Sequence, residues 1–352
     1  MLFPEISGSF GLGCMRLSLL EDGNVDYKQF CEMVDTFLAA GFNYFDTATS
    51  YIGGKSETSI RDCIVKRHPR ESFVLTNKLS SWLFEKEEEI LPLFQKQLDS
   101  CGVDYFDFYL MHAQNREYYK KYTDVHAYEI AKELKKQGKI RHIGISFHDS
   151  ADILDMILTE HPEIELVQIQ FNYLDYNDGC IQSRKCYEVC RKHNKPVAIM
   201  EPVKGGSLVN LPEEADKILR DLNGGSNASY ALRFAGGFEG VRMVLSGMSN
   251  MAQLNDNISF MKNLVPLDEK ELEAIDKVRF VFANLNLIKC TACEYCVDGC
   301  PKRINIPALF SCYNRQKRNE KWEGKNKYAE LTEKSGKASD CISCGKCERE
   351  CP

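Results

Sequence analysis

Two runs of cysteines near the end of the chain share the spacing C-x2-C-x2-C-x3-C-P. The first run, CTACEYCVDGCP, begins at Cys290, and the second, CISCGKCERECP, ends at Pro352. Three cysteines at two-residue spacing can bind one face of an iron–sulfur cluster, while the fourth, which precedes a proline, reaches a neighbouring cluster. The spacing therefore predicts two 4Fe-4S clusters whose ligands are exchanged between the runs.

Each cluster would take three thiolates from one run and the fourth from the other. The expected ligand sets are Cys290, Cys293, Cys296 and Cys351 for one cluster, and Cys341, Cys344, Cys347 and Cys300 for the other. Zinc is the main alternative, because paired C-x2-C units bind it readily. Zinc does not account for a third cysteine at fixed spacing followed by C-P and repeated twice, so the clusters are favoured.

The chain has 16 cysteines, and the eight outside these runs are predicted to be small buried hydrophobic side chains. The opening MLFPEISGSFGLGC lacks the basic region and apolar core of a secretory signal. We therefore expect a cytoplasmic protein, where disulfides are rare. The eight cysteines are Cys14, Cys31, Cys63, Cys101, Cys180, Cys186, Cys190 and Cys312.

A second group of chemistry-bearing residues lies in the first third of the chain. Asp46, Lys78 and His112 each follow a short apolar run, and they are spaced by about one strand–helix unit. Tyr51 lies five residues past Asp46, in the following loop. If the apolar runs are parallel barrel strands, their carboxyl ends meet at one rim, so these side chains are expected to share a site.

This quartet is suited to protonating an alkoxide while a hydride arrives at its carbon. Asp46 would pair with the buried ammonium of Lys78. The charge of Lys78 would lower the pKa of Tyr51 and make it a usable proton donor, and His112 would hydrogen-bond a carbonyl oxygen. Each residue alone has an ordinary alternative role, since a strand-end histidine is often a structural hydrogen-bonding group and an Asp-Thr pair is often a helix cap.

The elements that must position these residues alternate from about Gly11 to Asn250. Segments with apolar residues at helical spacing separate eight short apolar runs, and eight such units in about 250 residues predict a TIM (β/α)8 barrel. A doubly wound open sheet is the alternative, but it typically carries a G-x-G-x-x-G loop that this sequence lacks. The runs are SFGLGCMRL, FNYFDTA, FVLTNKL, YFDFYLMHA, IRHIGISFH, LVQIQFNYL, VAIMEPV and VRMVLSG.

The predicted domains are the barrel at 1–265, a connecting helix at 266–289 and a small, mainly helical, two-cluster ferredoxin-like domain at 290–352. The 352-residue chain is 43% hydrophobic and 27% charged with a net charge of −6, which indicates a real core and argues against nucleic-acid binding. It contains no apolar run of the roughly 20 residues that cross a bilayer. The expected partners are a small carbonyl or alcohol substrate and a redox partner protein.

The segments GLGCMRL, FNYFDTATSYIGGKSE, LTNKL and YLMHA resemble the aldo/keto reductase signature, G-x-x-x-x-D-T-A-x-x-Y-G with a later Lys and His. The resemblance covers about residues 9 to 260. With its tail, the chain is similar to the ferredoxin-like subgroup that carries a C-terminal 4Fe-4S dicluster domain. The resemblance implies NAD(P)H-dependent carbonyl–alcohol interconversion, with Tyr51 as proton donor, Lys78 and Asp46 tuning it, and His112 orienting the substrate.

The resemblance also implies cofactor-binding positions. Ser146 and Gln168 fall where the family holds the nicotinamide carboxamide, and Met200 before Pro202 stands where many members stack a Tyr. Phe147 replaces a usual Asn. The segment SGMSNMAQLNDN after the last strand would meet the pyrophosphate and adenosine through Gly247, Ser249, Gln253 and Asn257.

Coenzyme choice, NADP or NAD, is left open by two of these positions. Gly247 and Gln253 stand where many members place the Lys and Arg that bind the 2′-phosphate of NADP. Lys204, in the nearby EPVKGGSL loop, is a candidate replacement. The long segments after the fourth and seventh strands are expected to be loops that roof the pocket, with Tyr118, Tyr119 and Tyr122 forming an apolar or sugar-stacking wall.

Joining a hydride enzyme to iron–sulfur clusters raises a chemical problem, because a hydride carries two electrons and a cluster passes one, and the sequence shows no flavin motif. The first hypothesis is an NAD(P)H reductase whose clusters brace the tail or sense redox state. The second is an iron–sulfur electron-transfer or redox-sensing protein whose barrel binds a flavin or a partner. The third is a non-catalytic nucleotide-binding scaffold, which the complete quartet disfavours.

Overall fold

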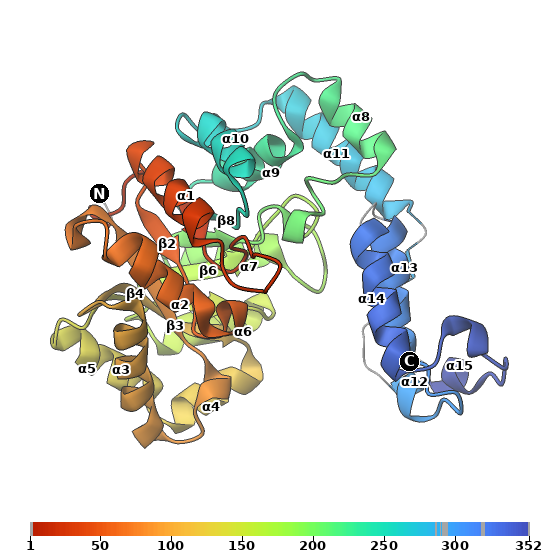
Figure 1. Cartoon of the computed structure of the whole chain (residues 1–352), viewed down its shortest axis with the longest axis horizontal. Helices are drawn as coiled ribbons and strands as arrows, with labels where there is room; N and C mark the ends of the chain where they lie inside the picture. The colour runs from red at the N-terminus through yellow and green to blue at the C-terminus, as the bar shows by residue number, and fades with distance from the viewer. Residues whose placement is uncertain (1–2, 286, 289, 291–294, 318–320, 351–352) are drawn as a thin grey trace. The chain divides into compact units, whose positions relative to one another are not determined.

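The computed structural model describes residues 3–350 except 286, 289, 291–294 and 318–320 (Figure 1). Eight parallel strands close into a barrel in sequence order, which confirms the TIM barrel and excludes the open sheet. The strands are β1 (Phe10–Gly13), β2 (Tyr44–Asp46), β3 (Val74–Leu79), β4 (Phe106–Gln114), β5 (Ile140–Phe147), β6 (Leu166–Gln170), β7 (Val197–Met200) and β8 (Val241–Ser246).

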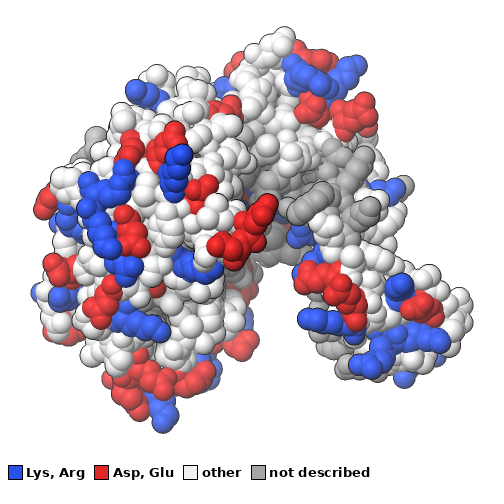
Figure 2. All heavy atoms as spheres, viewed as in Figure 1, with Lys and Arg blue, Asp and Glu red and all other residues white. Residues whose placement is uncertain are grey.

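A helix follows each strand, as the apolar spacing predicted (Figure 1). Acidic and basic side chains are interspersed over the barrel surface (Figure 2), which suits a water-facing outer layer. The helices that follow β1 to β8 in turn are α1 (Tyr27–Ala39), α2 (Lys55–Ile60), α3 (Ile90–Cys101), α5 (Ala127–Lys136), α6 (Ala151–Glu160), α7 (Ser183–Lys192), α9 (Asn227–Gly236) and α10 (Met251–Met261).

The two long segments expected to be loops each contain a helix, so that expectation was wrong. Helix α4 (Arg116–Asp124) begins after Asn115, whose side chain accepts a hydrogen bond from the backbone N–H of Tyr118. Helix α8 (Glu213–Arg220) begins after Pro212 and has three acidic residues in its first turn. Both are ordinary helix-start signals, because such groups satisfy or complement the exposed N–H groups of a first turn.

The barrel interior is filled by large apolar side chains from several strands, among them Tyr44, Phe108 and Met243. Phe3 and Ile6, which precede β1, belong to the same cluster. Gly144 in β5 makes this packing geometrically feasible. A Cβ there would stand 2.5 Å from Leu110 Cδ2 and 2.7 Å from the carbonyl oxygen of Leu166.

The cysteines outside the two runs follow the burial prediction only in part. Cys14, Cys63, Cys101, Cys186, Cys190 and Cys312 are buried.

Three of the eight cysteines differ from the prediction, either in exposure or in bonding. Cys180 is exposed, so burial was wrong there. Cys31 and Cys63 form a disulfide with their Cα atoms 4.8 Å apart, which corrects the expectation of isolated thiols. The two cysteines meet because α1 packs beside the π-helical turn Arg61–Val65 that continues α2, a tertiary contact that cysteine spacing does not predict.

The chain divides into two compact units, one formed by 1–204 with 228–267 and the other by 205–227 with 268–352. The second contains α8 packed on α11 (Glu269–Ala283), and α13 (Ile306–Lys317) packed on α14 (Lys321–Lys334). Short helices α12 (Tyr295–Asp298) and α15 (Lys346–Glu350) lie within the cysteine runs. Helices therefore separate the two runs, as their long interval predicted. Among the described residues, no helix combines the length and apolarity needed to span a bilayer.

We expect Gly144→Ala to destabilise the barrel by about 1–3 kcal/mol, because the added methyl would press on a backbone oxygen that cannot move aside. Thermal unfolding followed by circular dichroism would measure the lowered midpoint. Gly179→Ala is the matched control, since a Cβ there would meet none of the described atoms within 4 Å. Equal midpoints for the two variants would contradict this account of the core.

Candidate active site and candidate cluster site

Lys78, at the carboxyl end of β3, lies at the centre of the candidate active site. Its side chain is 1% exposed, and its Nζ donates to Asp46 Oδ1 at 2.6 Å and to the carbonyl oxygen of Thr47 at 2.8 Å. The same Nζ lies 3.3 Å from the hydroxyl of Tyr51 and 4.9 Å from the centre of that ring. The structure therefore brings Asp46, Tyr51 and Lys78 together at the rim of the barrel.

Burial and charge act in opposition on these three groups. Burial raises the pKa of Asp46, although Lys78 opposes the rise. Burial alone would lower the pKa of Lys78, but Asp46 and then Tyr51 hold it above its usual value. Burial raises the pKa of Tyr51 more than Lys78 lowers it, so the expected fall was wrong in its net direction. The Tyr51 phenol is consequently protonated at neutral pH.

His112, at the end of β4, faces the same space, with its ring centre 6.1 Å from that of Tyr51. Its Nδ1 is hydrogen-bonded to Ser80 Oγ at 2.7 Å. Burial, assisted by the charge of Lys78, lowers the pKa of His112 to about 2. The imidazole is therefore neutral, and Ser80 engages one nitrogen while Nε2 can meet a ligand.

A buried hydrogen-bond network behind the ion pair was not predicted from the sequence. Glu57 accepts from Thr49 Oγ1 and Asn77 Nδ2, both at 2.9 Å. Gln97 Nε2 donates to Thr49 Oγ1 and to the carbonyl oxygen of Lys78, both at 2.8 Å. The network ties the loop after β2 to β3. The sequence offered one signal for this network, because Glu57 is an acidic residue at the end of the signature segment FNYFDTATSYIGGKSE.

The tyrosines expected to form a wall lie in different surroundings. Tyr122 is buried beneath the site, where its hydroxyl donates to Leu79 O and accepts from the backbone N–H of His112. Tyr119 is also buried, so the wall was wrong for both, because α4 turns them inward. Tyr118 lies near the ring of Trp82, at 6.1 Å between centres.

Trp82 is a mouth residue that the sequence interpretation missed. It is 44% exposed, and its ring centre lies 5.0 Å from that of His112. The half-exposed ring of Trp82, beside the neutral ring of His112, gives the opening of the candidate active site a flat, apolar side.

Ser146 and Gln168, expected to hold the nicotinamide carboxamide, face each other in register on β5 and β6 and are 1% and 3% exposed. Ser146 Oγ accepts from the backbone N–H of Ala113 at 2.8 Å. Gln168 Oε1 has no hydrogen-bond partner among the described residues. A buried orphan acceptor beside a hydroxyl fits a carboxamide. Met200 ends β7, and Pro202 lies buried just beyond it.

The residues expected to meet the phosphates surround the start of α10. Gly247 follows β8, and the side chain of Arg16 lies 3.5 Å from where its Cβ would stand. The backbone N–H of Ser249 donates to Gln253 Oε1 at 2.7 Å. Asn257 is buried within the helix, where its Nδ2 donates to Ser246 Oγ at 2.9 Å.

Lys204, the candidate replacement cation, is engaged elsewhere. Its Nζ lies 2.5 Å from Oδ1 of the buried Asp175. A charge held by a buried carboxylate is not available to bind a phosphate without breaking that pair.

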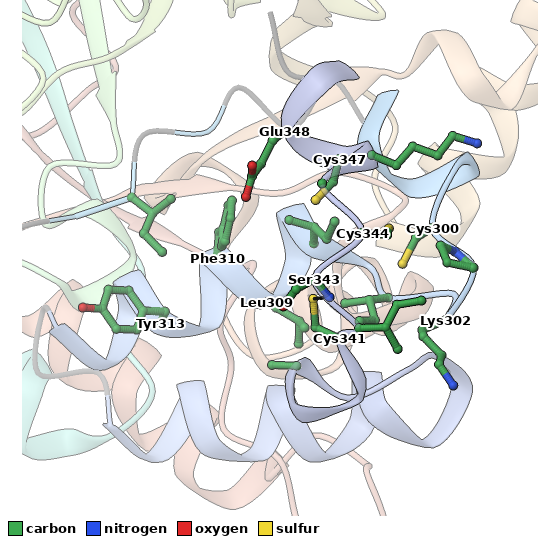
Figure 3. Close-up of a pocket in the computed structure, with 18 of the residues that line it drawn as sticks. Cys300, Lys302, Leu309, Phe310, Tyr313, Cys341, Ser343, Cys344, Cys347 and Glu348 are labelled. Carbon is green, nitrogen blue, oxygen red and sulfur yellow. Dashed lines mark hydrogen bonds between the residues drawn. The ribbon is translucent and has the colours of Figure 1, made fainter.

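A cavity of about 820 Å³ lies in the C-terminal unit, lined on one side by Leu309 and Phe310 of α13 (Figure 3). Five cysteines line it: Cys312 and the set predicted for one cluster, which is Cys300, Cys341, Cys344 and Cys347. The thiols border the space without meeting at a point, since no three Cys, His, Asp or Glu side chains of the described residues could share one metal ion.

This arrangement bears on the choice between zinc and iron. A zinc ion needs its four ligands at one point, whereas a cuboidal cluster binds one thiolate at each of four separate irons. Ligands that surround a space suit the cluster better. Of the other set, Cys290 and Cys296 are described but do not line this cavity, and Cys293 and Cys351 lie outside the described residues.

Comparisons with known proteins cover both parts of the chain. Residues 9–279 match the aldo/keto reductase family, and residues 289–352 match the 4Fe-4S dicluster domain. Among curated proteins, "Uncharacterized oxidoreductase YqkF" of Bacillus subtilis is 25% identical over 75% of this chain and 90% of its own length. "Protein REDOX 2" of Catharanthus roseus is 24% identical over 70% of this chain and 80% of its own length.

Solved structures share the barrel. Aldo-keto reductase AKR11C1 from Bacillus halodurans in its holo form has a TM-score of 0.63 and 23% identity, covering 77% of this chain and 91% of its own. An aldo-keto reductase from Klebsiella pneumoniae in complex with NADPH has a TM-score of 0.62 and 19% identity, covering 77% and 90%. At these identities the likeness shows the fold.

We expect His112 to stay neutral from pH 8 down to pH 5, because its pKa is lowered to about 2. Its imidazole proton resonances should therefore not shift over that range in an NMR titration. His126 is the internal control, because it is 63% exposed and Glu87 raises its pKa above the usual 6.5, so it should titrate. His112→Asn and His126→Asn assign the signals. A His112 signal that moves near pH 6.5 would contradict the buried, neutral ring.

Proposed function

The chain belongs to the aldo/keto reductase family of oxidoreductases, and we propose that it interconverts a small carbonyl compound and its alcohol by hydride transfer with NADP(H) or NAD(H). The observation that carries the proposal is the dual contact of Lys78 Nζ, at 2.6 Å from Asp46 Oδ1 and 3.3 Å from the Tyr51 hydroxyl. A buried ammonium between a carboxylate and a phenol is an arrangement for controlling one phenolic proton.

The residues at the carboxyl ends of β5 to β8 support binding of a nicotinamide cofactor, which would supply or accept the hydride. Ser146 and Gln168 would hold the carboxamide through the orphan Gln168 acceptor. Met200 would pack on the ring, since a thioether is a soft, adaptable surface. Pro202 and the segment with Gly247, Ser249, Gln253 and Asn257 would line the rest of the cofactor site.

The choice between NADP and NAD would depend on cations that can bind the 2′-phosphate of NADP near the adenosine. Gly247 and Gln253 carry no charge, and Lys204 is already paired with Asp175. A 2′-phosphate is recognised best by a cation that can bind it bidentately. The proposal therefore includes both NADP and NAD.

In carbonyl reduction, the proton would travel from the Tyr51 hydroxyl to the substrate oxygen. His112, neutral and held through Nδ1 by Ser80, would donate from Nε2 and orient that oxygen. The phenolate left on Tyr51 would be stabilised by Lys78, whose charge Asp46 maintains. In the reverse direction the phenolate would take the proton back.

The tail would hold two 4Fe-4S clusters, which supply one-electron exchange when bound. The cavity lined by Cys300, Cys341, Cys344 and Cys347 supports one of them. The spacing of the first run supports the other. The alternative, an electron-transfer or redox-sensing protein whose barrel only binds, makes the same prediction for the tail and a different one for Tyr51.

We expect Tyr51→Phe to lower turnover at least 100-fold with a panel of small aldehydes and ketones, because general acid catalysis contributes about 10²–10⁴ in rate. Cofactor affinity, measured by nicotinamide fluorescence, should stay within about threefold, since the ring is kept. Tyr187→Phe serves as the control, because among the described residues the Tyr187 hydroxyl donates to Glu239 O and contacts no group of the candidate site. Unchanged turnover in Tyr51→Phe would favour the barrel as a binding scaffold.

We expect protein purified without oxygen to contain about eight iron atoms and eight sulfides per chain. Cys344→Ser should lose about half of the iron, because it removes one ligand of one cluster. Cys312→Ser is the control, since Cys312 lines the same cavity but lies outside both runs. Zinc in place of iron, or full iron content in Cys344→Ser, would contradict the assignment.

A further inference from the structure

We propose that the surface around Cys341 to Cys347 docks a small acidic protein that carries one electron. Five exposed cations, here called the basic rim, lie in the segments that carry these thiols or directly next to them in sequence: Lys302, Arg303, Lys337, Lys346 and Arg349. The inference rests on the proposed cluster at Cys300, Cys341, Cys344 and Cys347. It adds the chemistry of the partner and the side chains that would recognise it.

Close contacts place two rim cations beside the cluster thiols. The Lys346 side chain lies over Gly299, where its Cε is 2.7 Å from the point at which a Cβ would stand. Gly299 directly precedes Cys300. The Arg349 guanidinium lies over Gly345, with Nη1 3.4 Å from the corresponding point. Both cations thus lie within reach of anything that approaches the cavity mouth.

The other rim cations come from two loops held against each other. Lys302 lines the cavity (Figure 3), two residues after Cys300. The backbone N–H of Gly336 donates to Arg303 O at 3.0 Å, which brings Lys337 beside that loop.

The five rim cations are exposed, and within the described part of the chain none of them pairs with a carboxylate. Unpaired, solvated cations on one face create a positive potential.

Acidic residues reduce this charge without cancelling it. Asp340 uses Oδ2 to accept from the backbone N–H of Lys337, and Glu348 is exposed at the cavity. Residues 290–352 hold 12 Lys and Arg against 9 Asp and Glu, a net charge of +3, whereas the whole chain carries −6. Figure 2 shows a group of Lys and Arg side chains at the tip of the C-terminal unit, with some Asp and Glu beside them.

The centre of this face is apolar. Ile342, between Cys341 and Ser343, is 57% exposed. An apolar centre with a charged rim is typical of small, transient electron-transfer contacts. A cluster exchanges single electrons, so the partner must be a one-electron carrier, and a positive rim selects one with a negative surface. One electron would pass between carrier and cluster, with no bond formed or broken and no proton moved.

The test measures binding of an acidic flavodoxin to the full-length, cluster-loaded protein by isothermal titration calorimetry at low and moderate salt. Cytochrome c, a basic one-electron carrier, is the comparison. Lys302→Glu/Lys337→Glu should weaken flavodoxin binding at least tenfold, and added salt should weaken wild-type binding steeply. Lys120→Glu/Lys136→Glu makes the same charge change at exposed positions on α4 and α5 of the barrel and should leave the affinity within twofold.

Iron content and the visible spectrum of every variant separate two kinds of failure. Wild-type protein without iron would refute the proposed clusters. Iron-replete wild type that does not bind flavodoxin, or binds cytochrome c better, would refute the docking surface. The docking surface is also refuted if Lys302→Glu/Lys337→Glu binds flavodoxin normally but loses iron, because the rim would then only balance the charge of the cluster and its thiolates.

Discussion

The ammonium of Lys78, buried to 1% exposure, is the constraint on which the barrel site depends. A charge removed from water requires a partner of opposite sign, and the partner here comes from the neighbouring strand. Asp46 of β2 lies in register with Thr76 of β3, two residues before Lys78. The ion pair therefore depends on the pairing of β2 with β3 in this register. The loop that follows β2 brings Tyr51 to the same charge.

Strand ends were predictable from the sequence because barrel strands are short apolar runs, and three successive runs carry a polar residue at or near their end. The positions of Asp46, Lys78 and His112 followed from that pattern alone. The direction of the Tyr51 pKa did not, since it depends on how burial and Lys78 balance in three dimensions. Similarly, the pairing of Cys31 with Cys63 depends on how α1 lies against the next helical segment, which no spacing encodes.

In the C-terminal unit, the sequence predicted the site residues but not what surrounds them. The spacing of its cysteines predicted which thiols belong together, and four of them border one cavity although Cys300 and Cys341 are far apart in the chain. The spacing could not predict what else surrounds that space. Three cations of the basic rim come from two loops and the other two from α15, and only the fold brings these segments together.

The network of Glu57 and Gln97 also limits how the enzyme can change its substrate range. Because this network fastens the loop after β2 to β3, its hydrogen bonds restrain that loop against movement. Adaptation to new substrates, whether natural or in the laboratory, is then expected to act on residues outside this network. Trp82, in the short turn Ser81–Leu83, and Tyr118, in α4, lie outside the network, so they can be replaced without breaking its hydrogen bonds.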